Sequence, residues 1–410
     1  MLIVELADIN RPLTVTLRYT IDSETGVLAR SASVRNGDSR PVRIDQIASA
    51  IFTLPVSDDY QLHYLTGRHA AEWTRKQVAI TPALTVLESR RGSTGHGNNP
   101  FFAIGKEGVT SEEDGPVWYG ALAWSGSFRI SVGQDNLGRI RIMGGYNPYD
   151  FSWTLKPGEA LDTPTFYAVY SSGGMGGASR SFHRFEVAHV IPGGTKAKLR
   201  PVLYNSWEAT AFDVTEAGQE VLAEKAARIG VERFVVDDGW FGARNSDKAG
   251  LGDWTVNRTK FPNSLKPPID KVHALGMDFG LWVEPEMVNV DSDLYRAHPD
   301  WVLNYPGRPR TEGRNQLVLN LARKDVRDHL LGVLDRLVSD NDIAFLSGIT
   351  TATGPKPGGR RCRCRTSSAS MWTMSATSTT FCPSCGGAIP SWRSRAARAG
   401  AGASIWASSA

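Results

Sequence analysis

The sequence predicts a multidomain protein of the β plus α/β class. We expect a β-sandwich domain over residues 1–195 and the first units of a (β/α)8 TIM barrel over residues 196–346. Three observations lead to this prediction. Short β-rich runs separated by turn residues fill the first half of the chain. Apolar runs then alternate with helical stretches, and the amino-acid composition changes after Leu346. Residues 347–410 are therefore treated as a separate segment.

The first domain is predicted from short runs of β-branched and aromatic residues with Gly, Asn, Asp and Pro between them. This spacing is typical of antiparallel strands stacked as a sandwich. A helical stretch from about Ser179 to Val190, followed by the turn IPGG, is expected to end the domain. The runs expected as strands are LTVTLRYTI, VLARSASVRN, VRIDQIASAIFTL, PALTVLESRRG, VWYGALAWSG, FRISVGQDN and TFYAVYSS.

The second domain is predicted from a repeated strand and helix pattern. The apolar runs PVLYN, RFVVDDGW and MDFGLWVEP suit buried parallel strands. Helices are expected from Val214 to Ile229, with Gly230 as the C-terminal cap, and near Ile269 to Leu275. About three complete units fit before the composition changes. The apolar stripe expected on the first helix consists of Val221, Leu222, Ala226 and Ile229.

The charge distribution argues against nucleic acid as a partner. The 46 Lys or Arg and 42 Asp or Glu give a net charge of +4. Residues 347–410 hold eight of the basic residues and none of the acidic ones, so residues 1–346 hold 38 basic and 42 acidic residues, a charge of −4. The two domains therefore lack a general attraction to phosphate backbones. All four cysteines also lie in the last segment, so the domains have no disulfide framework.

Membrane and export signals are not found in the sequence. No stretch approaches the roughly 18 apolar residues of a membrane span, and the opening MLIVELADINRPL lacks a basic region followed by an apolar block. We therefore expect no membrane partner and a cytoplasmic location.

Three apolar runs end in carboxylates and a large indole. Side chains that follow a barrel strand leave the core and face a shared cavity. Carboxylates accept hydrogen bonds from hydroxyls, and tryptophan faces pack on the apolar face of a pyranose. Asp237, Asp238, Trp207 and Trp282 are therefore candidate contacts to a sugar. Structural alternatives stay open, since the aspartates could cap a turn and the indoles could plug the barrel. The three runs are NSWEA, VVDDGWFG and GLWVEPEM.

Other polar residues are weaker candidates. Glu284 and Glu286 directly follow an apolar run. Two carboxylates at such a position indicate a bound ligand rather than an exposed loop. Taken alone, Arg314 would be a solvated loop arginine and His96 a structural or solvent-facing histidine. No spacing of His, Cys and Asp in residues 1–346 indicates a metal site, and the C-x-C and C-x-x-C pairs of the last segment are weak evidence for one. We expect neither a metal nor a cofactor.

Six strings occur in the order and spacing of one known family: NSWEA, DDGWFG, LGDWTVNRTKFPNSL, LGMDFGLWVEPEMV, LYRAHPDWVL and EGRNQLVLNLAR. By these strings the chain resembles glycoside hydrolase family 36, the retaining alpha-galactosidases also called melibiases. The segments RGSTGHGNNPFFAI, GYNPYDFSW and SRSFHRF resemble that family's N-terminal β-supersandwich. The resemblance implies that this domain is partial and that the chain is truncated at both ends.

The resemblance implies hydrolysis of terminal alpha-D-galactose from oligosaccharides by a retaining mechanism. At the matching positions, Asp237 and Asp238 would bind galactose hydroxyls, Trp207 and Trp282 would line the galactose pocket, and Arg314 would contact the substrate. A galactose-containing oligosaccharide is thus the implied partner, and the family suggests a homo-oligomer.

None of these residues is the nucleophile. The family's nucleophile is the Asp of a K-W-D-x-N-R strand that follows a segment like DNDIAFL, and its acid/base is an Asp in a later S-D-N-x-D motif. Here DNDIAFL is followed by SGITTATGP. SGITTATG can be encoded by codons that, when read in the preceding frame, give K-W-D-Y-N-R-N-W. Suitable codons for the string from Trp392 to Gly402 likewise give a string that resembles the family's next strand. We therefore expect a frameshifted, disordered tail, no catalytic residue in this chain and little or no hydrolysis.

Two other functions stay open. The chain could be a non-catalytic galactoside-binding remnant, which would bind galactose without turnover. It could also descend from a related alpha-galactosyl transferase or alpha-N-acetylgalactosaminidase, because the acceptor-side residues that would decide are absent.

Overall fold

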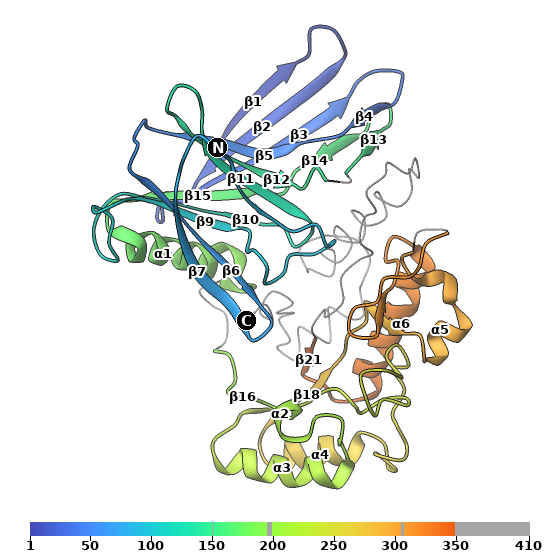
Figure 1. Cartoon of the computed structure of the whole chain (residues 1–410). Coiled ribbons are helices and arrows are strands. Elements are labelled where there is room, and N and C mark those ends of the chain that lie inside the picture. Colours follow the sequence, from blue (N-terminus) through green and yellow to red (C-terminus); the bar gives the residue numbers. More distant parts are fainter. Residues whose placement is uncertain (150, 195–198, 305–306, 349–410) are drawn as a thin grey trace. The chain divides into compact units, whose positions relative to one another are not determined.

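The computed structural model describes residues 1–149, 151–194, 199–304 and 307–348. These residues form two compact units, unit 1 up to residue 194 and unit 2 from residue 199 (Figure 1). The predicted boundary after residue 195 falls between the described ranges, and the predicted frameshifted tail lies outside them apart from residues 347 and 348. Within these ranges, no helix is long and apolar enough to cross a bilayer.

Unit 1 is built from antiparallel sheets, as its β-rich runs predict. The larger sheet has nine strands in the order β1-β2-β3-β15-β10-β9-β6-β7, with β14 paired to β3. A four-stranded sheet has the order β5-β12-β11-β8, and β4 pairs with β13. The strands are β1 (Leu2–Ala7), β2 (Leu13–Ile21), β3 (Leu28–Asn36), β4 (Val42–Ile44), β5 (Ala48–Leu54), β6 (Tyr60–Arg68), β7 (Ala71–Ala79), β8 (Thr85–Glu88), β9 (Phe101–Lys106), β10 (Val117–Leu122), β11 (Phe128–Gln134), β12 (Ile140–Tyr146), β13 (Trp153–Leu155), β14 (Ala160–Asp162) and β15 (Phe166–Ser171).

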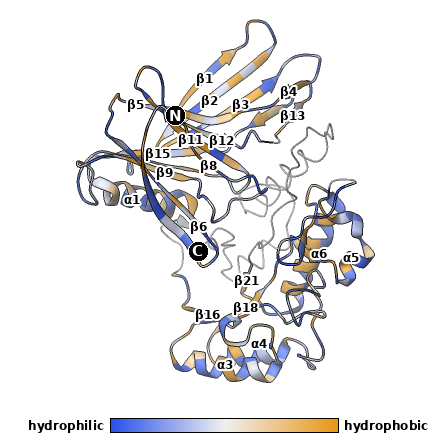
Figure 2. Ribbon diagram, viewed as in Figure 1, coloured by the Kyte–Doolittle hydropathy of each residue, from blue (hydrophilic) through white to orange (hydrophobic). Residues whose placement is uncertain are grey.

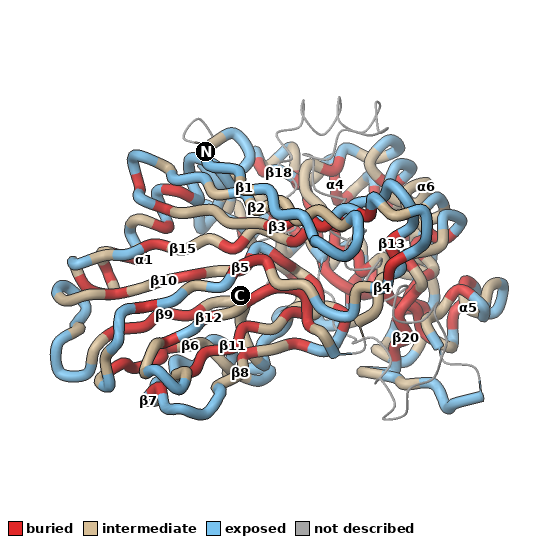
Figure 3. Tube along the Cα trace, turned by 90° about the horizontal axis from the view of Figure 1, so that it is seen from above, coloured by how far each residue is buried: buried red, intermediate tan, exposed pale blue. Residues whose placement is uncertain are grey.

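Aromatic side chains fill the space between the two larger sheets. Phe166 of β15 is fully buried and stacks on Phe52 of β5, with ring centroids 5.4 Å apart. A Cβ added at Gly144 of β12 would lie only 3.1 Å from the Phe166 ring, so the glycine lets the sheets approach. The strands carry both hydrophobic and hydrophilic residues (Figure 2), and β1 at the edge is mostly exposed (Figure 3). Two sheets facing across an apolar core agree with the predicted sandwich.

Helix α1 (Gly174–Phe185) covers the other face of the nine-stranded sheet, and a π-helical turn (Glu186–Val190) continues it. Phe182 of the helix packs on Tyr119 of β10, with ring centroids 4.7 Å apart. Both faces of the nine-stranded sheet are therefore covered at its centre.

The helix begins earlier than the expected start at Ser179, so that expectation was wrong. Its first turn contains three glycines, which weaken a helix and hide it from sequence patterns. At Gly174 the φ angle is +66°, and loop backbone from residues 111–114 lies 2.6 Å from the place of a Cβ. Close approach of this loop therefore requires glycine where the helix begins.

Unit 2 is built on a parallel sheet in the order β16-β17-β18-β21, with helices between successive strands. This arrangement confirms the predicted repetition of strand and helix. The described part of this sheet has four strands and does not form a closed barrel. The elements are β16 (Leu203–Asn205), α2 (Trp207–Thr210), α3 (Glu216–Arg228), β17 (Arg233–Val236), α4 (Lys266–Ala274), β18 (Asp278–Trp282), β19 (Met287–Asn289), α5 (Asp293–Ala297), a 3-10 turn (Pro299–Trp301), β20 (Gln316–Val318), α6 (Lys324–Asp340) and β21 (Phe345–Ser347).

Helix α3 ends as expected but buries a different stripe. Gly230 follows it with φ of +86°, which is the left-handed conformation of a glycine cap. The buried residues are Gln219, Ala223 and Ala226, whereas Val221 and Ile229 are 51% and 79% exposed. The expected apolar stripe was therefore wrong in part. The two small alanines occupy the buried face, and the larger aliphatic residues lie outside it.

Candidate functional site

The carboxyl ends of the parallel strands meet at one edge of the unit 2 sheet. Asn205 of β16 pairs with Val235 of β17, and Val235 pairs with Gly280 of β18. Gly280 in turn pairs with Phe345 of β21. Residues that follow these positions therefore lie along a shared edge, which is where open α/β sheets bind ligands. The three strand-end runs predicted to form a site are brought together here.

Asp237 is fixed at this edge by β16. Its carboxylate accepts a hydrogen bond from the side-chain amide of Asn205 and another from the backbone N–H of Asp238 at 2.8 Å. Its own backbone N–H donates to Ser206 Oγ at 3.0 Å. Burial raises the pKa of Asp237, and the nearby positive charge of Arg314 opposes that rise. The residue as a whole is 7% exposed, and its carboxylate is oriented by these hydrogen bonds.

Asp238 directs its carboxylate to Arg244. Arg244 Nε and Nη2 donate to the two carboxylate oxygens at 2.8 and 2.7 Å, and the side chains of this pair are 1% and 4% exposed. Arg244 also donates to Asn289 Oδ1 at 2.9 Å, and its guanidinium lies 5.2 Å from the centroid of the Phe212 ring. Asp238 therefore has a structural partner on both oxygens. Its contact with a sugar hydroxyl stays a prediction.

Arg314 is exposed in a turn with two successive left-handed residues, with φ of 53° at Arg314 and 60° at Asn315. Asn289 holds this turn, because its Nδ2 donates to the backbone oxygen of Asn315 at 2.8 Å. The same Asn289 accepts from Arg244, so one side chain links the turn to the partner of Asp238. The Arg314 charge also acts on Asp237.

Glu284 and Glu286 have different surroundings. Glu284 is 1% exposed, and its Oε2 accepts a hydrogen bond from Gln316 Nε2 at 3.1 Å. Glu286 is half-buried, and burial raises its pKa. Glu284 is therefore a buried and hydrogen-bonded group beyond β18, not loop surface.

The two candidate indoles differ in how much surface they offer. Trp282 is 5% exposed, and its ring lies nearly parallel to that of Phe241 at 6.2 Å and 6.1 Å from that of Trp254. Trp207 is half-buried and contacts Phe212 edge to face at 5.0 Å. Trp282 thus lies mainly inside an aromatic cluster, and Trp207 has more surface for a ligand.

Two basic side chains that support this edge were missed by sequence reasoning. Arg244 follows Asp238 within the same loop. The sequence feature that could have predicted their ion pair is a single arginine close to two aspartates. Lys260 lies farther along the chain, and its Nζ donates to the backbone oxygens of Phe212, Gly239 and Arg244 at 2.9, 2.8 and 2.8 Å. Its partners are carbonyls, which no side-chain pattern reveals.

We expect Lys260→Met to destabilise unit 2 by about 1–3 kcal/mol, because three carbonyls lose their donor in a partly buried loop. Hydrogen exchange of the β17 amides would measure the change. Lys266→Met is the control, because Lys266 pairs with Asp270 on the surface and should change stability by about 0–1 kcal/mol. Equal effects of the two variants would contradict this role of Lys260.

Outside this edge, His96 of unit 1 is exposed. Over the described ranges no group of three or more His, Cys, Asp or Glu is placed to hold a metal ion. At the strand edge, Asp237 can accept from hydroxyls, Arg314 can donate, and the Trp207 ring can pack on an apolar face. This combination suits a polyhydroxylated ligand.

Two family models match successive parts of the chain. The model described as the glycosyl hydrolase family 36 N-terminal domain matches residues 1–156, and the model described as Melibiase matches residues 160–349. The two matches together cover nearly all of the described residues.

Curated relatives show the same similarity. Alpha-galactosidase AgaA of Geobacillus stearothermophilus is 40% identical over 344 residues, which are 84% of this chain and 47% of the relative. Probable alpha-galactosidase G of Aspergillus terreus is 39% identical over 370 residues, which are 87% of this chain and 51% of the relative. The chain thus spans about half the length of the curated relatives it matches.

Solved structures agree with these relatives. A variant of AgaA in complex with 1-deoxygalactonojirimycin superposes with a TM-score of 0.87 at 35% identity, over 92% of this chain and 53% of that chain. The alpha-galactosidase from Lactobacillus brevis gives a TM-score of 0.86 at 33% identity, over 93% of this chain and 52% of that chain. With the fold, the strand-end residues and both family models in agreement, the chain belongs to glycoside hydrolase family 36.

Proposed function

We propose that unit 2 recognises the terminal alpha-D-galactosyl group of an oligosaccharide, as the galactose-binding part of a retaining alpha-galactosidase. Solved relatives support the ligand class, because variants of AgaA are described in complex with stachyose and with raffinose. The observation that carries the proposal is the Asp237 carboxylate, which is buried and oriented at the carboxyl ends of β16 and β17.

The remaining edge residues complete the recognition. Asp237 accepts hydrogen bonds from sugar hydroxyls, Arg314 donates to a sugar oxygen, and Trp207 packs on the apolar face of the ring. Trp282 supports this edge from the aromatic cluster, and Asp238 acts mainly through Arg244. Galactose is preferred because a fixed carboxylate discriminates between hydroxyl orientations.

For the chemical step, we propose binding without turnover by this chain. A retaining glycosidase needs a nucleophile and an acid/base whose carboxyl groups are about 5–5.5 Å apart. Asp237 and Asp238 are held in hydrogen bonds to neighbouring residues, and Glu284 accepts from Gln316. The sequence also lacks the K-W-D motif after residue 346. We therefore assign no catalytic residue.

A hydrolysis assay tests this part of the proposal. The purified 410-residue chain should release no nitrophenol from 4-nitrophenyl alpha-galactoside above the uncatalysed rate. A clear turnover that disappears with Asp237→Asn would contradict the proposed absence of catalysis while leaving recognition at this edge intact.

We expect Asp237→Asn to weaken galactose binding by roughly 10- to 100-fold, because hydrogen bonds to a charged group contribute about 1.5–3 kcal/mol. Isothermal titration of the full chain with galactose measures the change. Asp270→Asn is the matched control, because Asp270 pairs with Lys266 on the surface of α4 and should leave binding unchanged. Equal affinity of the Asp237 variant and the parent would argue against the site.

A related alpha-galactosyl transferase or alpha-N-acetylgalactosaminidase remains the alternative, and preferential binding of N-acetylgalactosamine in the same titration would favour it. We also propose that the chain binds galactosides and has neither nucleic acid nor a membrane as a partner. We propose in addition that it forms a homo-oligomer and is located in the cytoplasm.

A further inference from the structure

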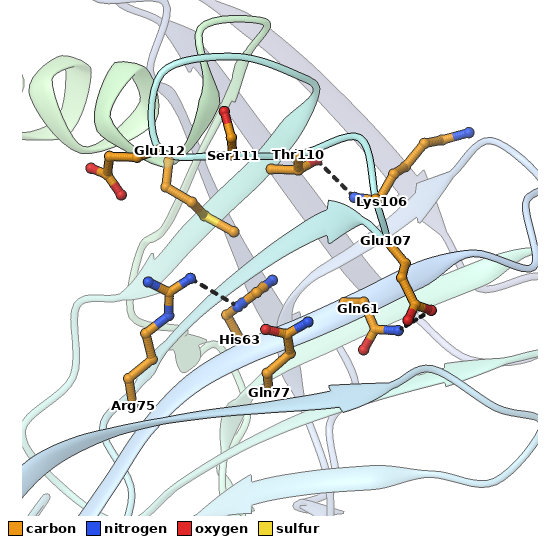
Figure 4. Close-up of a pocket in the computed structure, with 11 residues that line it drawn as sticks. Gln61, His63, Arg75, Gln77, Lys106, Glu107, Thr110, Ser111 and Glu112 are labelled. Carbon is orange, nitrogen blue, oxygen red and sulfur yellow. Dashed lines mark hydrogen bonds between the residues drawn. The ribbon is translucent and has the colours of Figure 1, made fainter.

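Unit 1 contains a second candidate site, a cavity of about 220 Å³ on the α1 side of the nine-stranded sheet (Figure 4). Polar side chains of β6 and β7 form its floor, and the loop of residues 107–112 forms its roof. Pockets for drug-sized ligands measure about 300–1,000 Å³, so this cavity suits a small ligand.

The floor follows from strand register. Gln61 and His63 are two residues apart on β6 and therefore point to the same face. His63 pairs with Gln77 of β7, and Arg75 is two residues from Gln77, so all four side chains share this face. Gln61 and His63 are 8% and 9% exposed, which makes them unusually buried for polar residues.

The roof is held against the sheet at Gly105 of β9. A Cβ at this position would lie 2.8 Å from the side chain of Thr110, so the loop packs where a larger residue would block it. Thr110 Oγ1 accepts from the backbone N–H of Lys106 at 2.8 Å and donates to the backbone oxygen of Pro116 at 2.8 Å. These contacts fix the cavity as a built feature of the fold.

His63 presents a fixed donor to this cavity. Arg75 Nη2 lies 3.3 Å from His63 Nδ1, and a guanidinium can only donate, so Nδ1 is the acceptor. Burial and the Arg75 charge lower the pKa of His63 to about 4. The ring is therefore neutral at pH 7 with its proton on Nε2, which has no hydrogen-bond partner among the described residues.

The remaining wall offers both donors and acceptors. Gln61 Nε2 donates to Glu107 Oε2 at 2.9 Å, which leaves the Gln61 oxygen as an acceptor. The Gln77 amide has no partner in the described parts of the chain and offers both kinds of group. Arg75 and Lys106 contribute positive charge and Glu107 and Glu112 contribute negative charge, so the wall favours neither an anion nor a cation.

We propose that this cavity binds one ring of a neutral, polyhydroxylated ligand, a sugar. Hydroxyl groups both donate and accept, which suits a wall with a donor at His63 Nε2, both kinds of group on the Gln77 amide, and acceptors on the Gln61 oxygen and the Glu107 carboxylate. The site is separate from Asp237 in sequence and in unit, and it does not depend on galactose recognition by unit 2.

The proposal is tested on the full chain with the Asp237→Asn change, which weakens sugar binding at the unit 2 edge. The imidazole ¹H–¹⁵N signals of His63 are followed by NMR during titration with D-galactose, with D-glucose and, separately, with inorganic phosphate. We expect saturable shifts of the Nε2 signal with at least one sugar and none with phosphate. Shifts with phosphate alone, or with no probe, would overturn the proposal.

Two variants assign the effect to the cavity. Arg75→Met and Gln77→Leu should each weaken sugar binding at least tenfold, and Lys76→Met, on the opposite face of β7, should not. Thermal melting checks that each variant is folded, and Gln77→Leu decides alone if Arg75→Met does not fold. Equal affinity of Gln77→Leu and Lys76→Met would contradict the site. Failure of galactose to bind the unit 2 edge would leave this result unaffected.

Discussion

Replacing Arg244 by methionine is expected to destabilise unit 2 by about 3–5 kcal/mol, because it leaves the Asp238 carboxylate buried without its charged partner. Three further contacts are lost, to Ala249, Asn289 and the ring of Phe212. The free energy of unfolding of unit 2 is measured by hydrogen exchange of the β17 and β18 amides.

Two further variants separate the cause from a general loss of packing. Arg296→Met removes an exposed arginine with two surface partners and should change stability by about 0–1 kcal/mol. The double variant Asp238→Leu with Arg244→Met removes both buried charges and should be more stable than Arg244→Met alone. If the single change costs less than about 1 kcal/mol, the buried pair is not what holds this loop.

Acidification from pH 7 to pH 4 is expected to destabilise unit 1 through His63 by up to about 3 kcal/mol. The pKa of His63 is lowered from 6.5 to about 4 in the folded chain, first by burial and then by Arg75. Between these values the unfolded chain binds more protons than the folded one, so stability is lost as pH falls through this window. Urea unfolding at several pH values measures the loss.

The histidine contribution is isolated with His63→Gln, which cannot take up a proton. Carboxylates also titrate as pH falls, so the informative quantity is the difference between parent and variant over the same window. The parent should lose more stability than the variant between pH 6.5 and about 4. Parallel curves would mean that His63 has an ordinary pKa in the folded chain.

Much of unit 1 follows from local sequence pattern, and the exceptions have physical causes. LTVTLRYTI coincides with β2 because alternation and β-branched residues define it locally. VRIDQIASAIFTL, expected as one run, forms β4 and β5, which pair with different partners. The expected runs also left out several strands, namely β1, β6, β7, β9, β12, β13 and β14. Weak patterning explains two of these, β6 and β7. Their polar residues face solvent and the cavity, so the hydrophobic pattern that indicates a strand is weak there.

The candidate site was predictable in its location but not in its internal contacts. Strand ends followed by carboxylates indicate the shared edge, because parallel strands end together. That Asp238 pairs with Arg244, or that Trp282 is enclosed by aromatic rings, depends on the path of the loop between β17 and α4. Side chains that bond to backbone carbonyls, such as Lys260, leave no pattern in sequence.

The central claim is that the carboxyl edge of the unit 2 sheet holds one galactosyl group against Asp237. A crystal structure of the 410-residue chain with galactose tests it most directly. We predict a sugar at the ends of β16, β17 and β18, with a hydroxyl within hydrogen-bonding distance of the Asp237 carboxylate. Galactose bound elsewhere in unit 2, with this edge filled by protein side chains, would contradict the account.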